Sequence, residues 1–362
     1  MNNNDLKKVI EQFVLNYDVN RYGNGHINET YLVEPKKYIL QKINTGIFKN
    51  ADELMENIVN VTDFLRDKII KSGGNPDRET LNVVRTLDGK LFYRDENGDC
   101  FRMYRFISDT KTIDSNPTAE ELCNAAKAFG KFQKMLDDFP AEKLYETIPD
   151  FHNTPDRFAK LLKAIEDDAV GRKKLVEKEI EFALSCKDWV GQVCDGIADG
   201  SIPLRVTHND TKINNVMFDE KTSEAICVID LDTVMPGSLL YDFGDALRIG
   251  AATADEDETD LSKVEFDLSK FESFAKGFFE EMSECMTDKE IELLAFSAKL
   301  LTYECGIRFL TDYLNGDTYF TIHREHHNID RARTQFKLVA DMDKKMAQMK
   351  KIISDLKIKY NR

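Results

Sequence analysis

The first hundred residues alternate between short apolar runs and polar turns, which is typical of a small antiparallel sheet. Two dipeptides, Asp88-Gly89 and Asn97-Gly98, separate runs of β-branched and aromatic residues and are strong hairpin signals. The predicted strands are Thr30–Val33, Tyr38–Ile43, Leu81–Leu87, Leu91–Tyr93 and Cys100–Ile107. This part of the chain is therefore predicted to be rich in β-structure.

One long helix interrupts the predicted strands. Between Ala51 and Lys71, apolar side chains recur every three or four residues and so fall on one face of a helix. These side chains are Leu54, Ile58, Val61, Leu65 and Ile69. Asn50, followed three residues later by Glu53, resembles a capping box at the start of the helix. We expect this helix to cover the sheet.

After Ser108 the apolar spacing becomes helical. Thr118–Leu136 carries one apolar face of alanine, leucine and phenylalanine. Thr287 with Glu290 forms a second capping-box pattern, which opens a helix that runs to about Leu314. The rest of the chain is therefore predicted to be mainly helical.

A single hairpin breaks the helical pattern, with strands at Val216–Phe218 and Ala225–Ile229 joined by a polar turn. The fold class that follows is α+β, with two lobes. We expect an antiparallel, β-rich N-terminal lobe over residues 1–107 and a mainly helical C-terminal lobe over residues 108–362.

Composition narrows the class of protein. A chain of 362 residues is long enough for two domains with sizeable cores. A net charge of −15 argues against nucleic-acid or anionic-membrane partners, because both need a basic surface. No run of about 18 apolar residues suggests a membrane span, and the start of the chain does not resemble a signal peptide.

The seven cysteines are odd in number, widely spaced and never arranged as CxxC. Neither a disulfide framework nor a zinc knuckle is indicated, so we interpret them as reduced thiols of a cytoplasmic protein. Nothing in the sequence indicates an obligate protein partner.

The chemistry of the chain centres on residues 208–215, which read HNDTKINN and fit the pattern H-x-D-x-K-x-x-N. Phosphoryl transfer needs an acceptor hydroxyl held in line, magnesium on the phosphate oxygens and positive charge on the moving group. Asp210 can take the hydroxyl proton, Lys212 can neutralise developing charge, and Asn215 can offer magnesium an amide oxygen. The alternative is a polar turn in which His208 is simply buried and hydrogen-bonded.

A second magnesium ligand is expected to return to Asn215 across the hairpin. Asp230 follows the second strand directly and is favoured, with Asp232 in reserve. Asp242-Phe243-Gly244 matches the magnesium-binding tripeptide of protein kinases, but it lies twelve residues beyond Asp230. We therefore interpret Asp242 as a structural carboxylate that supports the following segment, Phe243–Ile249.

Taken together, HNDTKINN, IDLD and YDFGDALR resemble the aminoglycoside phosphotransferase and choline kinase superfamily, whose fold is similar to that of protein kinases. With ECGIRFLTDYLNGD and HINETYLV added, the chain is very similar to the bacterial N-acetylhexosamine 1-kinases. The likeness runs from about Arg21 to Lys337. It implies an ATP- and Mg²⁺-dependent kinase that phosphorylates the anomeric hydroxyl of N-acetylglucosamine or N-acetylgalactosamine, giving the α-1-phosphate.

The resemblance also implies roles for individual residues. Asp210 and Lys212 are catalytic, Asn215 and Asp230 bind magnesium, and Asp242 is structural. The sugar contacts it implies are His26, Asn209, Arg308 and Tyr319. The nucleotide contacts expected are Gly23 and Gly25 in a glycine loop, and Arg105 and Ile107 at the hinge.

Some alternatives stay open. The strand position of the protein-kinase phosphate lysine is Gln41, with Lys42 on the opposite face, and its glutamate partner is either Glu53 or Glu56. Ile249 stands where relatives carry an aromatic residue, which would weaken stacking on a sugar.

Alternative readings of two sites also stay open. Arg308 could instead pair with Asp312 on the same helix. The histidines at 323–327 would suit a metal hydrolase, but their spacing is not H-E-x-x-H.

The alternative function is a choline, homoserine or aminoglycoside kinase of the same superfamily. A nucleotide-binding pseudokinase would be expected to lack Asp210, Asn215 or Asp230, and all three are present.

Overall fold

The computed structural model describes residues 3–14, 18–22, 28–35, 38–114 and 116–361. The chain divides into two compact units. The first comprises 1–112, 138–149 and 216–236, and the second comprises 113–137, 150–215 and 237–362. The first unit extends to residue 112, past the predicted boundary at residue 107, and also includes 138–149 and 216–236. The division into lobes at 1–107 and 108–362 stays a prediction.

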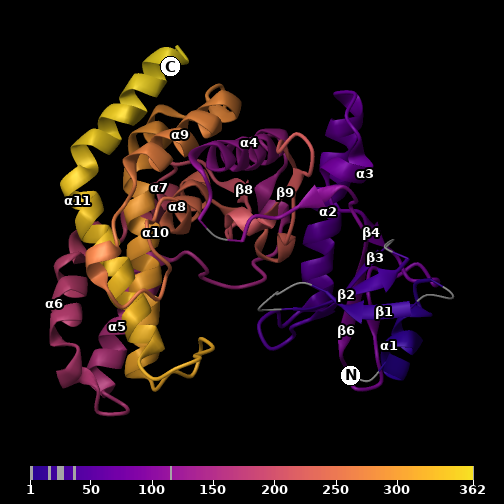
Figure 1. Ribbon diagram of the computed structural model, residues 1–362, viewed down its shortest axis with the longest axis horizontal. Helices are drawn as coiled ribbons and strands as arrows, with labels where there is room; N and C mark the ends of the chain where they lie inside the picture. Colours follow the sequence, from indigo (N-terminus) through magenta and orange to yellow (C-terminus); the bar gives the residue numbers. More distant parts are fainter. Residues whose placement is uncertain (1–2, 15–17, 23–27, 36–37, 115, 362) are drawn as a thin grey trace. The chain divides into compact units, whose positions relative to one another are not determined.

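The first unit is built on an antiparallel sheet, as the alternating pattern predicts (Figure 1). Its strand order is β1-β2-β3-β6-β4, and β5 also pairs with β6. The strands are β1 (Asp18–Arg21), β2 (Glu29–Glu34), β3 (Tyr38–Ile43), β4 (Val83–Val84), β5 (Tyr93–Arg94) and β6 (Cys100–Arg105). A second sheet of order β10-β9-β7 has the strands β7 (Thr110–Lys111), β9 (Val216–Asp219) and β10 (Ala225–Val228).

The first unit has three α-helices and two 3₁₀ turns among its described residues, and the helix from Ala51 to Lys71 begins at the capping residue that the sequence predicts. The helices are α1 (Asn3–Ile10), α2 (Ala51–Lys71), α3 (Pro76–Glu79) and the 3₁₀ turns η1 (Ala141–Lys143) and η5 (Leu231–Thr233). The Asn50 side chain accepts hydrogen bonds from the backbone of Asp52 and Glu53, which confirms Asn50 as the cap of α2. Of the predicted capping box, only this half is among the contacts of the described residues. Helix α1 packs on the sheet through Leu6 and Ile10, against Val33 among others, and so supplies part of its core (Figure 1).

The second unit is mainly helical. Its helices are α4 (Ala119–Met135), α5 (Thr154–Asp167), α6 (Glu177–Ser185), α7 (Gln192–Ala198), α8 (Leu239–Gly250), α9 (Leu268–Met282), α10 (Asp288–Leu314) and α11 (His327–Lys359). Its shorter elements are η2 (Lys173–Leu175), η3 (Lys187–Trp189), β8 (Arg205–Thr207), η4 (Ile213–Asn215) and η6 (Leu261–Lys263), and β11 (Met235–Gly237) contains the point at which the chain enters it. The capping box of Thr287 and Glu290 is present at the start of α10.

Helices α10 and α11 run alongside each other and carry the core of this unit together with α5 and α6 (Figure 1). Helix α8 packs closely on α10 at Gly244, where a Cβ atom would lie 2.4 Å from the carbonyl oxygen of Ser297. One residue earlier, Phe243 is fully buried among the rings of Phe274 and Phe278, at 5.3 Å from each. The middle of α8 is therefore fixed by packing on both sides.

None of the described helices is both long enough and apolar enough to cross a membrane.

Candidate active site

The loop that carries the predicted catalytic residues follows β8 and is held in place by Asp242. The backbone amides of His208 and Asn209 donate to the two carboxylate oxygens of Asp242, at 2.9 and 2.7 Å. Gln133 of α4 donates to the same carboxylate at 2.5 Å. Asn209 has a φ of +66°, a left-handed conformation that asparagine tolerates and that these contacts stabilise.

Asp242 is therefore a support for the loop before it. It lies in the first turn of α8 and is 1% exposed. Burial raises the pKa of Asp242, and the hydrogen bonds donated by the amides of His208 and Asn209 and by Gln133 oppose that rise. The predicted structural role agrees with these contacts, but the segment supported is the loop at 208–211 and not Phe243–Ile249.

A second anchor reaches the loop at Thr211. Its hydroxyl donates to the backbone carbonyl oxygen of Asp242 at 2.6 Å, and its amide donates to Asp245 at 3.1 Å. Asp245 is ion-paired with Arg248 at 3.1 Å. Asp245 and Arg248 lie in the motif YDFGDALR, but spacing along the chain could not predict their roles, because Asp245 meets the loop only after α8 has folded.

Asp210 and Lys212 form an ion pair within the loop, with Nζ of Lys212 at 3.0 Å from Oδ1 of Asp210. Burial disfavours the charged form of Asp210, but the charge and hydrogen bond of Lys212, together with the charge of Arg248, hold the pKa of this carboxyl below its ordinary value. Asp210 in turn raises the pKa of Lys212. Both groups are therefore charged at neutral pH.

Asn215 lies against Asp210. Its Nδ2 donates to the backbone oxygen of Asp210 at 2.8 Å and to Oδ2 of Asp210 at 3.3 Å. The amide is oriented by these bonds so that its carbonyl oxygen, Oδ1, is the atom that a cation can bind. The structure thus brings Asp210, Lys212 and Asn215 together.

The remaining residues of the motif have structural contacts. His208 is fully buried and lies edge-on to Phe129 and Phe132 of α4, at 5.8 and 6.1 Å between ring centroids. The Asn209 side chain is buried and accepts a hydrogen bond from the Thr207 hydroxyl at 3.0 Å. Its predicted contact with a sugar stays a prediction.

A buried network also holds the backbone of Asn209. Its carbonyl oxygen lies 3.0 Å from Nε2 of His152, whose Nδ1 lies 2.8 Å from Glu304 on α10. Thr154 donates to the same carboxylate at 2.5 Å. The loop is therefore tied to α10 as well as to α8.

In the first unit, Asp230 and Asp232 follow β10. Asp230 has a φ of +59°, a conformation that turns the chain after the strand. Asp232 is buried in an ion pair with Arg102 and accepts a hydrogen bond from Asn28 at 2.6 Å. Because Asp232 is committed to these partners, Asp230 stays the favoured ligand.

Arg102 is the residue of this unit that the sequence did not single out. It lies across from Gln41 in the register of β3 and β6 and donates to Oε1 of Gln41 at 2.8 and 3.0 Å. Arg102 therefore brings a buried positive charge beside the strand position where protein kinases hold a lysine. Lys42 instead pairs with Asp99 at 2.6 Å.

The structure describes two of the four predicted nucleotide contacts, Arg105 and Ile107. Gly23, Gly25 and His26 lie outside the described residues. Arg105 ends β6 as an exposed side chain, and Ile107 is buried, with its carbonyl oxygen accepting from Thr110 at 3.0 Å. On α2, Glu53 is half-buried and Glu56 is exposed, so the choice between them stays open.

Arg308 and Tyr319 both contact phenylalanine rings. The Arg308 guanidinium lies over the rings of Phe151 and Phe320, at 5.7 and 5.5 Å from their centroids. Tyr319 is 65% exposed and lies edge-on to Phe320 at 4.8 Å. The stacked guanidinium keeps its N–H donors in its own plane, where a ligand can reach them.

The proposed pairing of Arg308 with Asp312 is wrong. The Asp312 carboxylate instead accepts hydrogen bonds from the backbone amides of Thr318, Tyr319 and Phe320, at 2.8–2.9 Å. Asp312 therefore fixes the loop that carries Tyr319.

The histidines at 323–327 serve the start of α11. His326 is the residue before the helix, with a φ of +62°, and His327 is buried with its Nε2 3.0 Å from Asp257. The amide of His323 donates to Nδ1 of His327 at 3.2 Å. These contacts give the histidines a structural role.

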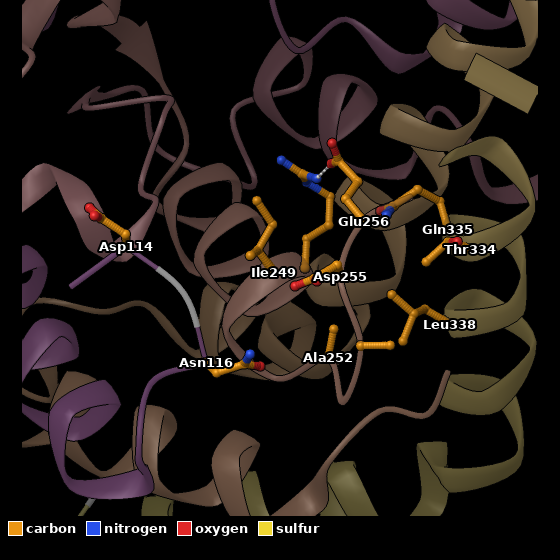
Figure 2. A pocket seen from close by; sticks show the side chains of 11 residues that line it. Asp114, Asn116, Ile249, Ala252, Asp255, Glu256, Thr334, Gln335 and Leu338 are labelled. Atoms are coloured by element: carbon orange, nitrogen blue, oxygen red, sulfur yellow. Dashed lines mark hydrogen bonds and ion pairs between the residues drawn. The ribbon is translucent and has the colours of Figure 1, made fainter. Parts of the chain in front are cut away.

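A cavity of about 130 Å³ lies beside the end of α8, in the second unit (Figure 2). Figure 2 shows Ile249 at its wall, with Ala252 and Leu338 as further apolar lining. Arg248, also in the wall, pairs with Glu256 at 2.5 Å. Ile249 thus faces a cavity whose wall is linked through Arg248 and Asp245 to the catalytic loop.

Comparisons with known proteins agree with this chemistry. A model of the phosphotransferase enzyme family matches residues 18–272. A crystal structure of spectinomycin phosphotransferase in complex with ADP and spectinomycin has a TM-score of 0.62 and 15% identity, covering 96% of this chain and 99% of that one. A microcompartment-associated aminopropanol kinase has a TM-score of 0.59 and 13% identity, covering 96% and 98%.

A choline/ethanolamine kinase family protein from Mesorhizobium loti has a TM-score of 0.53 and 14% identity, covering 94% of this chain and 92% of that one. At these identities the likeness shows the fold. The predicted α+β, kinase-like fold is confirmed.

Proposed function

The chain belongs to the phosphotransferase enzyme family, and from this premise we propose that it is an ATP- and Mg²⁺-dependent kinase of N-acetylhexosamines. The product is the α-1-phosphate of N-acetylglucosamine or N-acetylgalactosamine. The observation that carries the proposal is the ion pair of Asp210 and Lys212 beside Asn215, on a loop fixed by Asp242. The choice of a sugar rests on the sequence motifs around Asp210 and Arg308.

In the proposed reaction, the Asp210 carboxylate orients the anomeric hydroxyl and accepts its proton. The sugar oxygen bonds to the γ-phosphorus, and the bond between that phosphorus and the oxygen bridging to the β-phosphate breaks, releasing ADP. Lys212 leaves Asp210 as the carboxylate loses its charge and neutralises the transferred group.

Asn215 and Asp230 fit a magnesium site by their chemistry. The Nδ2 of Asn215 is held by Asp210, which leaves an amide oxygen as ligand, and Asp230 adds a carboxylate. Val216 pairs with Val228 in the hairpin, so the segments that lead into β9 and out of β10 share one end of it. The ion supplies positive charge to the phosphate oxygens when bound.

The remaining roles follow the sequence expectation. Gly23, Gly25, Arg105 and Ile107 would contact the nucleotide, and His26, Asn209, Arg308 and Tyr319 would contact the sugar. Arg308 is the best supported of these, because its guanidinium lies over two aromatic rings and the Asp312 carboxylate is bound by backbone amides. We place the enzyme in the cytoplasm, with no nucleic acid, membrane or obligate protein partner.

A panel of acceptors tests the proposal. The protein is incubated with ATP, Mg²⁺ and one acceptor, and ADP release is measured. Either N-acetylhexosamine is expected to give turnover, and phosphorus NMR is expected to locate the new ester at the anomeric oxygen. Turnover with choline, homoserine or an aminoglycoside and none with either hexosamine would contradict the proposal.

Removing the positive charge of Lys212 is expected to shift the pH profile. In Lys212→Met, burial of Asp210 is opposed by fewer cations, so the pKa of this carboxyl rises. A base is active only when deprotonated, so the acidic limb of kcat/KM is expected to move to higher pH. Lys212→Arg keeps the charge and is the control. An acidic limb at the same pH in all three proteins would show that Asp210 is not the base.

A further inference from the structure

A second arginine, Arg157 of α5, lies beside Arg308. Its Nη2 donates to the backbone carbonyl oxygen of Phe151 at 3.0 Å, and the ring of the same Phe151 lies under the Arg308 guanidinium. The Nε of Arg157 is buried, with no hydrogen-bond partner among the residues that the structure describes. An unpaired buried donor is costly, so a partner is expected from outside the chain.

The carboxylates around this arginine pair are engaged elsewhere. Glu304, one turn before Arg308 on α10, binds His152 and Thr154. Asp156, the residue before Arg157, pairs with Lys160 at 2.5 Å. Burial and the charge of Arg308 lower the pKa of Arg157, and the charges of Glu304 and Asp156 oppose that lowering. Among the described residues neither guanidinium is ion-paired, so the two positive charges are not neutralised by direct contact with a carboxylate.

We infer that Arg157 and Arg308 form a cation-excluding site for the substrate that receives the phosphoryl group. This site, called the acceptor site, binds neutral or anionic, oxygen-rich molecules and rejects protonated amines. The inference rests on the proposed function and narrows its substrate class. Guanidinium groups only donate hydrogen bonds, so they suit hydroxyl and carbonyl oxygens. A protonated amine has no acceptor to offer and is repelled by two like charges.

The two arginines are expected to recognise the acetamido group of an N-acetylhexosamine. Its carbonyl oxygen can accept from either arginine, whereas the ammonium of an unacetylated hexosamine cannot. The arginine pair would therefore distinguish N-acetylglucosamine from glucosamine. It would also exclude choline and aminoglycosides, which carry positive charge.

The test compares kcat/KM for N-acetylglucosamine and glucosamine at a pH where the amine is protonated. The acetylated sugar is expected to be preferred by at least about tenfold, and the gap is expected to narrow as the pH rises and the amine loses its proton. Arg157→Gln is expected to raise the KM for N-acetylglucosamine by about tenfold, leave the KM for ATP unchanged and reduce the preference. Arg157→Lys keeps the charge and is expected to retain the preference.

Arg333→Gln is the matched control, because Arg333 is another arginine of the second unit whose partner, Glu179, lies at 2.6 Å. It is expected to change neither KM nor the preference. Thermal melting establishes that each variant is folded. Equal use of protonated glucosamine and N-acetylglucosamine, or an Arg157→Gln enzyme with an unchanged preference, would overturn the inference while the kinase proposal stands.

If no hexosamine is phosphorylated, the proposed function fails. The arginine site is then tested by ligand binding, measured as a change in melting temperature. Glucuronate is then expected to raise the melting temperature of the wild-type protein but not of Arg157→Gln, and glucosamine is expected to raise neither. Stabilisation of the wild-type protein by glucosamine equal to that by glucuronate, or no stabilisation by glucuronate, would count against the arginine site.

Discussion

Replacing Asp210 by asparagine is expected to lower kcat by about 10²- to 10⁴-fold, the usual contribution of a general base. Asparagine keeps the shape of the side chain but cannot take the acceptor proton. It also breaks the ion pair with Lys212. Initial rates of ADP release with saturating ATP and N-acetylglucosamine measure the effect.

Two controls accompany this variant. Asp199→Asn changes an exposed carboxylate at the end of α7 and is expected to leave kcat unchanged. Circular dichroism and thermal melting are expected to show Asp210→Asn folded like the wild type. A kcat for Asp210→Asn within a factor of about three of the wild-type value would remove Asp210 from the catalytic role, since a base contributes far more.

The same substitution at two other aspartates is expected to give opposite results. Asp230→Asn is expected to abolish turnover at low Mg²⁺ with little change in melting temperature, because asparagine is a weaker ligand and tolerates the positive φ. Asp242→Asn is expected to lower the melting temperature by several degrees. One oxygen that accepts from His208 or Asn209 is replaced by a donor, which costs roughly 1–3 kcal/mol for each buried amide left unpaired.

Differential scanning calorimetry and a magnesium titration of activity separate the two variants. Raising Mg²⁺ is expected to restore part of the activity of Asp230→Asn and none of the stability of Asp242→Asn. A stable, magnesium-dependent Asp242→Asn beside an unstable Asp230→Asn would reverse the metal assignment.

The sequence predicted those parts of the structure whose causes are local. Helices α2 and α10 begin at their capping residues, Asn50 and Thr287, because the caps act within one turn. Asp210, Lys212 and Asn215 could be grouped because they lie on one short loop. The relative positions of residues that are close in the chain are set by local backbone conformation, so their contacts can be predicted from spacing.

The bounds of one strand could not be predicted from its apolar residues. The predicted strand Leu81–Leu87 is reduced to Val83–Val84. A turn begins at Thr86, whose amide donates to the carbonyl oxygen of Lys90 at 2.9 Å, and Leu87 is 67% exposed. The apolar run continues past the point where its backbone leaves the sheet, and β-propensity does not register that.

Contacts between distant segments could not be predicted from spacing. Asn28 and Asp232 are 204 positions apart in the chain, yet they are hydrogen-bonded. Arg102, which the sheet register places opposite Gln41, pairs with the same Asp232 carboxylate. Arg157 and Arg308 meet through Phe151, which lies six residues before Arg157 but in a segment far along the chain from Arg308. The charge of the acceptor site is therefore a property of the fold and has no signature in a single motif.

The tight contact of Gly244 with Ser297 gives the tripeptide Asp242-Phe243-Gly244 a meaning of its own. Asp242 holds the catalytic loop, Phe243 fills an aromatic cluster, and Gly244 allows two helices to touch. Each of the three residues therefore stabilises the fold, whether or not phosphate is transferred. During divergence, a descendant that lost Asp210 or Asn215 would be expected to keep all three letters. The tripeptide is therefore evidence of an intact scaffold, and catalytic competence has to be judged from Asp210, Lys212 and Asn215 on the loop that it supports.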